Sequence, residues 1–415
     1  MKKTVVRPGR TISGTRKVPI HVSGLKIGMD VIELDRPWLE TPFVLQGFTI
    51  ESLDQIETIS QYCEYVYIDE KNDQWLAAEE RATLQPRGGN RHYEPLTTNR
   101  QEFRAARSIH NSGRRLTRSF MEDVRLGRAI DIQAVEETVS ETVSSVIRNA
   151  NAMLWLSRIR NADEYTSEHS LNVALLAINF GRHLGFGVDE LNKLGLCAML
   201  HDVGKMRTPT EILNKPGALS ADEFLIMQAH PTHGRDILMA HKDIYHGAID
   251  VAYSHHETLD GSGYPRKIKS TGLSDFTRIV TICDVYDAIT SDRVYKAGQS
   301  SHRALKILYN GRGERYDERL VTEFIECIGL YPPGTLVELH SGDIGIVIST
   351  NYRNRHLPKV LMVLDTDKNP AQETVLNLAT EAAQDHSNRL IREVLPNGKY
   401  DIRIEKYIER GLMLS

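Results

Sequence analysis

The feature of this sequence that most limits its fold is a set of histidines and aspartates placed where apolar, helix-like segments meet polar loops. The segment LGLCAML, residues 194–200, is almost entirely apolar and leads directly into His201 and Asp202. A second apolar segment, residues 279–283, leads into Asp284. Amphipathic and apolar helices bury their apolar faces in a core, so we expect these polar side chains at the edge of one helical core.

Three further positions repeat this arrangement. His169 begins a predicted helix in DEYTSEHSLNVALL, and His230 lies in MQAHPTHG. His255 and His256 end a helix-like segment that runs into the glycine-rich turn DGSGYP. Each histidine alone has an ordinary structural explanation. Five histidines and two aspartates with the same placement predict a metal centre, and the set consists of His169, His201, Asp202, His230, His255, His256 and Asp284.

The residue types indicate which metals and which substrate such a centre takes. Neutral imidazole with a bridging carboxylate suits Fe, Mn, Zn, Co or Ni, whereas Ca and Mg prefer oxygen ligands. Two such cations about 3.5–4 Å apart can share a hydroxide and clamp a phosphate. Lys205, Arg293 and Lys296 follow two of the ligand motifs and add permanent positive charge, which suits a phosphate diester. The alternative is that these three cations are surface charges only.

Three motifs together resemble the HD-GYP family, a subgroup of the HD superfamily of metal-dependent phosphohydrolases. They are HDVGK at 201–205, HHETLDGSGYP at 255–265 and DVYDAITSDRVYK at 284–296. The resemblance covers roughly residues 145–335. It implies a mainly α, helical domain that hydrolyses cyclic di-GMP to pGpG, and in many members on to GMP, by means of a metal-bridging hydroxide. It also implies a place in bacterial second-messenger signalling, with biofilm formation and motility as outputs.

The resemblance assigns roles to individual residues. It implies that the seven residues of the predicted centre are metal ligands and that Asp202, the shared carboxylate, is catalytic together with Lys205. The residues implied to contact the nucleotide are Lys205, Tyr264, Asp287, Arg293 and Lys296. The cofactors expected from it are two divalent transition-metal ions, Fe or Mn in the first place, with Ni, Co or Zn as alternatives.

One departure from the family pattern concerns a third metal. Some members carry a glutamate one helical turn before the first histidine, and this chain has Tyr165 there, with Glu164 one residue earlier. A phenol is a poor ligand for a divalent ion at neutral pH. We therefore expect two metals per chain, retained cleavage of cyclic di-GMP, and slower conversion of pGpG to GMP.

Outside the helical middle, the residue patterns change. Residues 1–84 contain the strand-like runs VIEL and EYVYID with a helix-like segment between them, in which Leu53, Ile56 and Ile59 share a face, after a basic arm of about 20 residues. After Pro332 and Pro333 come five short β-type runs: TLVEL, DIGIVIST, KVLMVLD, TVLNL and IREVL. The predicted organisation is a mixed α/β regulatory or sensory module (1–84), a linker with connecting helices (85–140), a catalytic domain (141–332) and a small antiparallel β unit (333–415).

Composition excludes several classes of protein. The chain has 415 residues, of which 40% are hydrophobic and 26% charged, so it is not disordered throughout. No run of about 18 uncharged apolar residues occurs, which excludes a membrane-spanning helix. Four cysteines far apart in the sequence fit a reducing, cytoplasmic setting, and the net charge of −4 argues against a general nucleic-acid partner.

Three functional hypotheses stay open at this point. The first is a cyclic di-GMP phosphodiesterase, with cyclic di-GMP and pGpG as ligands. The second is a non-catalytic module that binds cyclic di-GMP or docks a partner. The third is a phosphodiesterase for pGpG or another cyclic dinucleotide. A diguanylate cyclase of the GGDEF type and a second copy of the chain are the expected protein partners.

Overall fold

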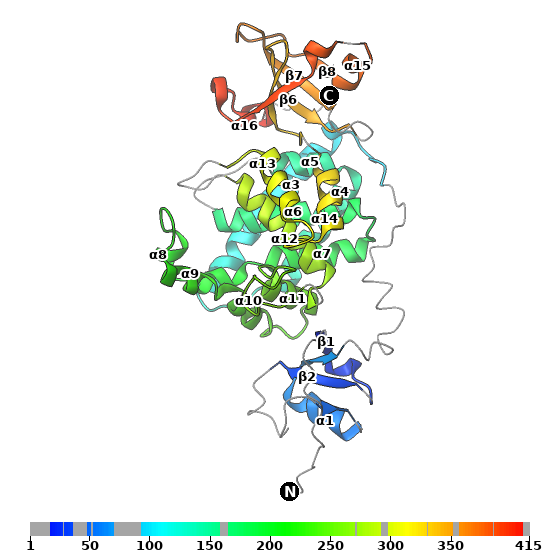
Figure 1. The fold of residues 1–415 in the computed structure, drawn as a ribbon, viewed down its shortest axis with the longest axis vertical. Helices are drawn as coiled ribbons and strands as arrows, with labels where there is room; N and C mark the ends of the chain where they lie inside the picture. Colours follow the sequence, from blue (N-terminus) through cyan, green and yellow to red (C-terminus); the bar gives the residue numbers. More distant parts are fainter. Residues whose placement is uncertain are drawn as a thin grey trace. The chain divides into compact units, whose positions relative to one another are not determined.

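The computed structural model describes residues 17–27, 29–35, 48–50, 53–69, 93–157, 165–269, 272–291, 298–329, 331–351, 357–384 and 386–409 (Figure 1). The chain divides into two compact units. The first comprises residues 1–85 and 268–273, and the second comprises residues 86–267 and 274–415. No helix in the described part of the chain combines the length and the apolar character of a membrane span.

The first unit contains an antiparallel four-stranded sheet in the order β1-β4-β2-β3 and the helix α1. The elements are β1 (Lys17–His21), β2 (Asp30–Leu34), β3 (Phe48–Thr49), α1 (Leu53–Tyr62) and β4 (Tyr65–Asp69). The strands predicted at VIEL and EYVYID are confirmed as β2 and β4. Two expectations are wrong: residues 17–20 of the predicted basic arm form β1, and Leu53 is exposed instead of sharing the buried face of Ile59.

The second unit is built mainly of helices, as predicted. They are α3 (Asn99–Arg125), α4 (Ile132–Arg148), α5 (Ala150–Leu156), α6 (Tyr165–His183), α7 (Val188–Leu200), the 3₁₀ helix η5 (Val203–Arg207), α8 (Thr210–Leu213), α9 (Ala221–Met227), α10 (His230–Leu238), α11 (His246–Ser254), α12 (Asp275–Thr290), α13 (Ser301–Asn310) and α14 (Glu318–Ile328). α6 is buried on nearly every side, as is the apolar second half of α7, and both contribute to the centre of the core. Apolarity all round is typical of a helix enclosed by other helices.

α4 shows how local sequence sets the boundaries of an element. Asp131 caps its first turn by accepting a hydrogen bond from the Ala134 N–H at 3.0 Å. Val135, Val139 and Val143, spaced four residues apart, are buried on one face. This is the helix that the valine spacing predicts.

A five-stranded antiparallel sheet completes the second unit, in the order β8-β7-β6-β5-β9. Its strands are β5 (Leu336–Leu339), β6 (Ile344–Ser349), β7 (Lys359–Leu364), β8 (Val375–Asn377) and β9 (Ile391–Leu395), with α15 (Leu378–Ala383) and α16 (Ile404–Glu409) beside them. All five predicted β runs are confirmed. Alternate residues of β6 point to different cores: Ile346 joins the helical core, whereas Val347 packs with Leu378 of α15.

Candidate metal centre

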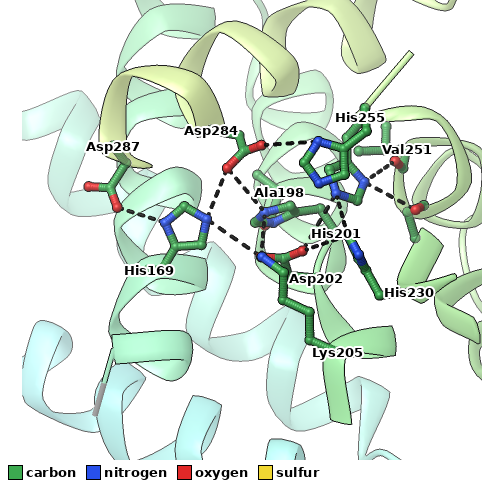
Figure 2. Close-up of polar contacts among 12 residues, drawn as sticks. His169, Ala198, His201, Asp202, Lys205, His230, Val251, His255, Asp284 and Asp287 are labelled. Atoms are coloured by element: carbon green, nitrogen blue, oxygen red, sulfur yellow. Dashed lines mark hydrogen bonds and ion pairs between the residues drawn. The ribbon is translucent and has the colours of Figure 1, made fainter. Parts of the chain in front are cut away.

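The predicted ligands come together from five separate helices. His169 lies in α6, His201 caps the C-terminus of α7, and Asp202 follows it at the start of η5. His230 begins α10, His255 caps the C-terminus of α11, and Asp284 lies in α12. Figure 2 shows Asp202 between His169 on one side and the pair His230 and His255 on the other. Helix ends supply His201, His230 and His255, whereas the expectation of a helix end at Asp284 is wrong, because α12 continues to Thr290. The apolar helices behind these side chains share one core.

Each oxygen of the Asp202 carboxylate faces a different pair of histidines. Oδ2 lies 3.5 Å from Nε2 of His169 and 3.3 Å from Nε2 of His201. Oδ1 lies 3.3 Å from Nε2 of His230 and 3.5 Å from Nε2 of His255. A carboxylate placed in this way can bridge two cations, one held by each pair.

Backbone carbonyls fix which ring nitrogen faces the centre. Nδ1 of His201 lies 2.7 Å from the carbonyl oxygen of Ala198, and Nδ1 of His230 lies 2.7 Å from that of Met227. Nδ1 of His255 lies 3.1 Å from the carbonyl oxygen of Val251 (Figure 2). A carbonyl oxygen only accepts, so each Nδ1 carries the hydrogen and each Nε2 turns its lone pair towards Asp202.

Asp284 and His256 complete the two groups. Oδ1 of Asp284 lies 3.0 Å from Nε2 of His169 and 4.0 Å from Nε2 of His201, and its Oδ2 lies 3.9 Å from Nδ1 of His256. The side chain of His256 is 24% exposed, whereas those of the other centre histidines are almost fully buried. The potential ligand groups are His169, His201 and Asp202; Asp202, His230, His255 and His256; and His201, His255 and Asp284.

Burial and charge keep these groups in the protonation states that metals require. Burial lowers the pKa of His230 to about 4 in spite of the opposing effect of Asp202, and it also lowers the pKa of His201. Burial by itself raises the pKa of Asp202, but the Lys205 ammonium and the neighbouring histidines outweigh it, so that the pKa lies well below its usual range. The imidazoles of His201 and His230 are therefore neutral and the Asp202 carboxylate is ionised near pH 7.

Two buried polar atoms in the centre lack a hydrogen-bond partner among the described residues. They are Nε2 of His201 and Oδ1 of Asp202. An orphaned imidazole lone pair and an orphaned carboxylate oxygen both have a high cost of burial unless a ligand satisfies them. A divalent transition metal satisfies both, so the residues present fit such an ion.

Comparison with known proteins assigns the chain to a family. A family model described as an HD domain matches residues 147–320, and one described as a domain of unknown function (DUF3391) matches residues 17–135. A protein of Pseudomonas aeruginosa named cyclic di-GMP phosphodiesterase PA4108 is 34% identical over 376 residues, which cover 88% of this chain and 90% of that relative. The chain belongs to the HD-GYP family of HD-domain phosphodiesterases. HD-domain phosphohydrolases are metal-dependent, in agreement with the clustered histidines and aspartates.

Other similar proteins match a smaller share of the chain. The 3'3'-cGAMP-specific phosphodiesterase 1 of Vibrio cholerae is 36% identical over 159 residues, which cover 38% of this chain and 36% of that protein. Among solved structures, Bd1817, an HDG"Y"P protein from Bdellovibrio bacteriovorus, aligns with a TM-score of 0.46 at 16% identity. That alignment covers 74% of this chain and 98% of the Bdellovibrio chain.

Asp287 contacts one of the predicted metal ligands. Its Oδ2 lies 2.7 Å from Nδ1 of His169 and also accepts a hydrogen bond from Ser291 Oγ at 2.9 Å (Figure 2). The side chain is buried. In this HD-GYP centre Asp287 therefore holds His169 much as backbone carbonyls hold His201, His230 and His255. The nucleotide contact that the family resemblance implies for Asp287 stays a prediction.

Two glycines let the HD-GYP motifs pack closely. A Cβ at Gly204 would lie 2.0 Å from the carbonyl oxygen of His230 and 2.4 Å from the nitrogen of Gly234. A Cβ at Gly263 would lie 2.4 Å from the carbonyl oxygen of His256. Only glycine permits these approaches, which place the HD loop on α10 and fold the GYP turn over His256.

Sequence reasoning missed the role of Glu257 in this HD-GYP turn. Its buried carboxylate accepts hydrogen bonds from the backbone N–H groups of Arg266, at 2.6 Å, and Lys267, at 3.1 Å. These bonds hold Arg266 and Lys267, which follow the GYP sequence, against Glu257, which follows His256. The buried acid directly behind two ligands was a usable signal, but its partners are backbone groups, which no side-chain pattern reveals.

The remaining predicted residues divide into two groups. Nζ of Lys205 contacts Oδ2 of Asp202, and the Tyr264 ring stacks on His256 with 4.7 Å between ring centroids and an interplanar angle of 27°. Arg293 and Lys296 lie outside the described residues, as does Glu164. Tyr165 is the first residue of α6.

Proposed function

We propose that this chain hydrolyses cyclic di-GMP to pGpG at the centre around Asp202, with two divalent transition-metal ions. The observation that carries the proposal is the position of Asp202, whose two oxygens face two separate histidine pairs. The relative with that named activity matches 88% of the chain. A complete ligand set argues against a module that only binds the nucleotide.

The proposed ligands form two groups around the shared carboxylate. One ion would be held by His169, His201, Asp202 and Asp284, and the other by His230, His255, His256 and Asp202. When bound, the pair of ions supplies a nucleophile at neutral pH and Lewis-acid polarisation of the phosphate. Imidazole and carboxylate ligands suit Fe or Mn, which we propose first, with Ni, Co or Zn as alternatives.

The chain's own residues would orient and neutralise the substrate. Neutral Nε2 atoms are held in place by backbone carbonyls and by Asp287, so the ligands are preorganised before anything binds. We propose that Lys205, Arg293 and Lys296 contact the phosphates and that Tyr264 shapes the nucleotide pocket. Lys205 contacts the centre through Asp202, and Tyr264 contacts it through His256.

A second candidate substrate is another cyclic dinucleotide. The 36% identity to a 3'3'-cGAMP-specific phosphodiesterase of Vibrio cholerae supports testing it. Both substrates present the same phosphate diester to the metals and differ in a base. The centre around Asp202 would serve either, and residues that contact the bases would discriminate between them.

The test combines metal analysis of the purified protein with product identification. Cyclic di-GMP, 3'3'-cGAMP and pGpG are supplied separately, and products are separated by chromatography. We expect about two metals per chain, pGpG as the first product from cyclic di-GMP, and slower formation of GMP, because Tyr165 replaces a third-metal glutamate. A metal-replete protein that cleaves 3'3'-cGAMP but not cyclic di-GMP would favour the second candidate. Absence of cleavage of all three would overturn the proposal.

We place the enzyme in the cytoplasm as part of the same proposal. All four cysteines have free thiols, and three of them are buried in the two cores. Free buried thiols fit a reducing compartment, where disulfides are rare.

A further inference from the structure

Three consecutive apolar side chains are exposed on α9, a short helix near the metal centre. Phe224 is 46% exposed, Leu225 64% and Ile226 43%. Scattered exposed apolar residues are ordinary, but a run of three on one helix indicates a surface that contacts something. The position of this exposed surface, close to the metal centre, indicates which molecule contacts it.

The arm that carries α9 is well braced. Nζ of Lys215 contacts both carboxylate oxygens of Glu223, at 2.8 and 2.6 Å. Ser220 and Glu223 form a reciprocal capping box at the start of the helix. Figure 1 shows α8 and α9 projecting at the edge of the helical body next to α10. The exposed side chains therefore belong to a folded arm.

A series of aromatic rings connects this arm to the metal centre. The Phe224 ring meets the Tyr264 ring at an interplanar angle of 75°, with 6.3 Å between centroids. Tyr264 in turn stacks on His256 at 4.7 Å. Phe224 is thus one ring away from a proposed metal ligand. Because it meets Tyr264 nearly at a right angle and stays 46% exposed, part of its ring surface is open to a ligand.

We propose that Phe224 is a base-stacking residue that receives one guanine of the cyclic dinucleotide while the scissile phosphate lies at the centre around Asp202. The inference rests on the proposed function and adds the element that recognises a base. A dinucleotide carries its bases one sugar away from each phosphate, and every base offers a π-face that stacks on an aromatic side chain. Leu225 and Ile226 are exposed on the same helix, but they carry no ring and take no part in the proposed stack.

The test compares three variants of the full chain: Phe224→Ala, Phe224→Trp and Leu225→Ala. Steady-state kinetics with cyclic di-GMP gives KM and kcat. Calorimetry with a phosphorothioate analogue, which keeps both guanines but resists cleavage, gives a dissociation constant without turnover. Leu225→Ala is the matched control, because it removes exposed apolar surface from the same helix and leaves the Phe224 and Tyr264 rings in place.

In Phe224→Ala we expect KM and the dissociation constant to rise about 5- to 100-fold, the range of a lost base stack, with kcat changed less than about threefold. Phe224→Trp and Leu225→Ala should stay within about twofold of the wild type. Unchanged binding in Phe224→Ala, failure of Phe224→Trp to restore it, or an equal loss in Leu225→Ala would overturn the inference. A wild type that binds the analogue through Phe224 but does not cleave cyclic di-GMP would overturn the proposed function alone.

Discussion

At the scale of single residues, four of the five histidines of the centre use one ring nitrogen to fix their orientation and keep the other for a ligand. His201, His230 and His255 donate to backbone carbonyls three or four residues earlier in the chain, and His169 donates to Asp287. The backbone acceptors are insensitive to mutation, since every residue type has a carbonyl. Asp287 is the exception and gives a way to test the orienting interaction.

Asp287→Asn should weaken metal binding. An amide of the same shape keeps the packing but replaces a charged acceptor at the His169 Nδ1–H, and such outer partners are worth about 10- to 100-fold in metal affinity or activity. Metal affinity is measured by competition with a chelator. A rise in KM for cyclic di-GMP at unchanged metal affinity would instead return Asp287 to the nucleotide-contacting role implied by family resemblance.

His110 on α3 gives a prediction about pH. Burial, with help from Arg114, lowers its pKa to about 4, whereas the unfolded chain has the ordinary value near 6.5. Below pH 6.5 the unfolded chain takes up a proton that the folded chain does not accept until about pH 4, so the free energy of unfolding falls as pH decreases. Lowering the pH from 7.5 to 5 should reduce the free energy of unfolding by about 2 kcal/mol through this one group.

Denaturant unfolding of the wild type and His110→Leu at both pH values measures the effect. From pH 7.5 to pH 5, the free energy of unfolding of His110→Leu should rise by about 2 kcal/mol relative to that of the wild type. The same difference in free energy of unfolding at both pH values would show that folding does not lower the pKa of His110.

At the scale of elements, the metal centre depends on how closely the HD loop approaches α10. Gly204 in η5 faces Gly234 in α10, but the two positions differ in the room that they leave for a Cβ atom. A Cβ at Gly204 would lie 2.0 Å from a backbone oxygen, whereas a Cβ at Gly234 would have no neighbour nearer than 3.5 Å. The loop next to Asp202 can therefore approach the helix of His230 this closely only with glycine at position 204.

Gly204→Ala should destabilise the fold and reduce metal content together. Overpacking against backbone costs about 1–3 kcal/mol or more, because backbone cannot move aside as a flexible side chain can. Gly234→Ala, its matched control, adds a methyl group in ordinary contact on a helix and should be neutral or stabilising. Thermal unfolding and elemental analysis test both; equal behaviour of the two variants would contradict the packing argument.

The sequence predicts most elements well and the contacts between them less well. The four-residue valine spacing of α4 and the alternation in the five β runs are local patterns, so periodicity suffices to find them. β1 was missed because a short strand with basic residues before it has no periodicity to detect. The ligand types of the centre follow from motifs, whereas the hydrogen bond between Asp287 and His169 joins residues 118 positions apart and depends on how α6 packs on α12.

At the scale of the whole second unit, the C-terminal sheet is part of the same core as the helices. Ile344, Ile346 and Ile348 of β6 join the core cluster that also contains Trp155 of α5. The Trp155 indole Nε1–H donates to the carbonyl oxygen of Ile348 at 3.1 Å. The sheet therefore stabilises the helices around the centre even though its strands supply none of the proposed ligands.

A chain that ends at residue 332 should consequently be less stable than the full chain. Removing the sheet exposes Trp155 and the apolar residues beside it, and 1 kcal/mol corresponds to about 2–4 °C in a domain of this size. We expect Tm to fall by at least about 5 °C. Trp155→Phe in the full chain is the control, since it loses one hydrogen bond, worth about 1 kcal/mol. Equal Tm values for the truncated and full chains would make residues 333–415 an independent domain.

The central claim is that Asp202 is shared by two cations, and Asp202→Asn tests it most directly. The amide keeps the size of the side chain but loses the second ligating oxygen, so we expect metal content to fall below two per chain and turnover of cyclic di-GMP to fall at least about a hundredfold. Asp189→Asn, at an exposed position at the start of α7, should behave as the wild type. A metal-replete Asp202→Asn protein with turnover within about tenfold of the wild type would contradict the account.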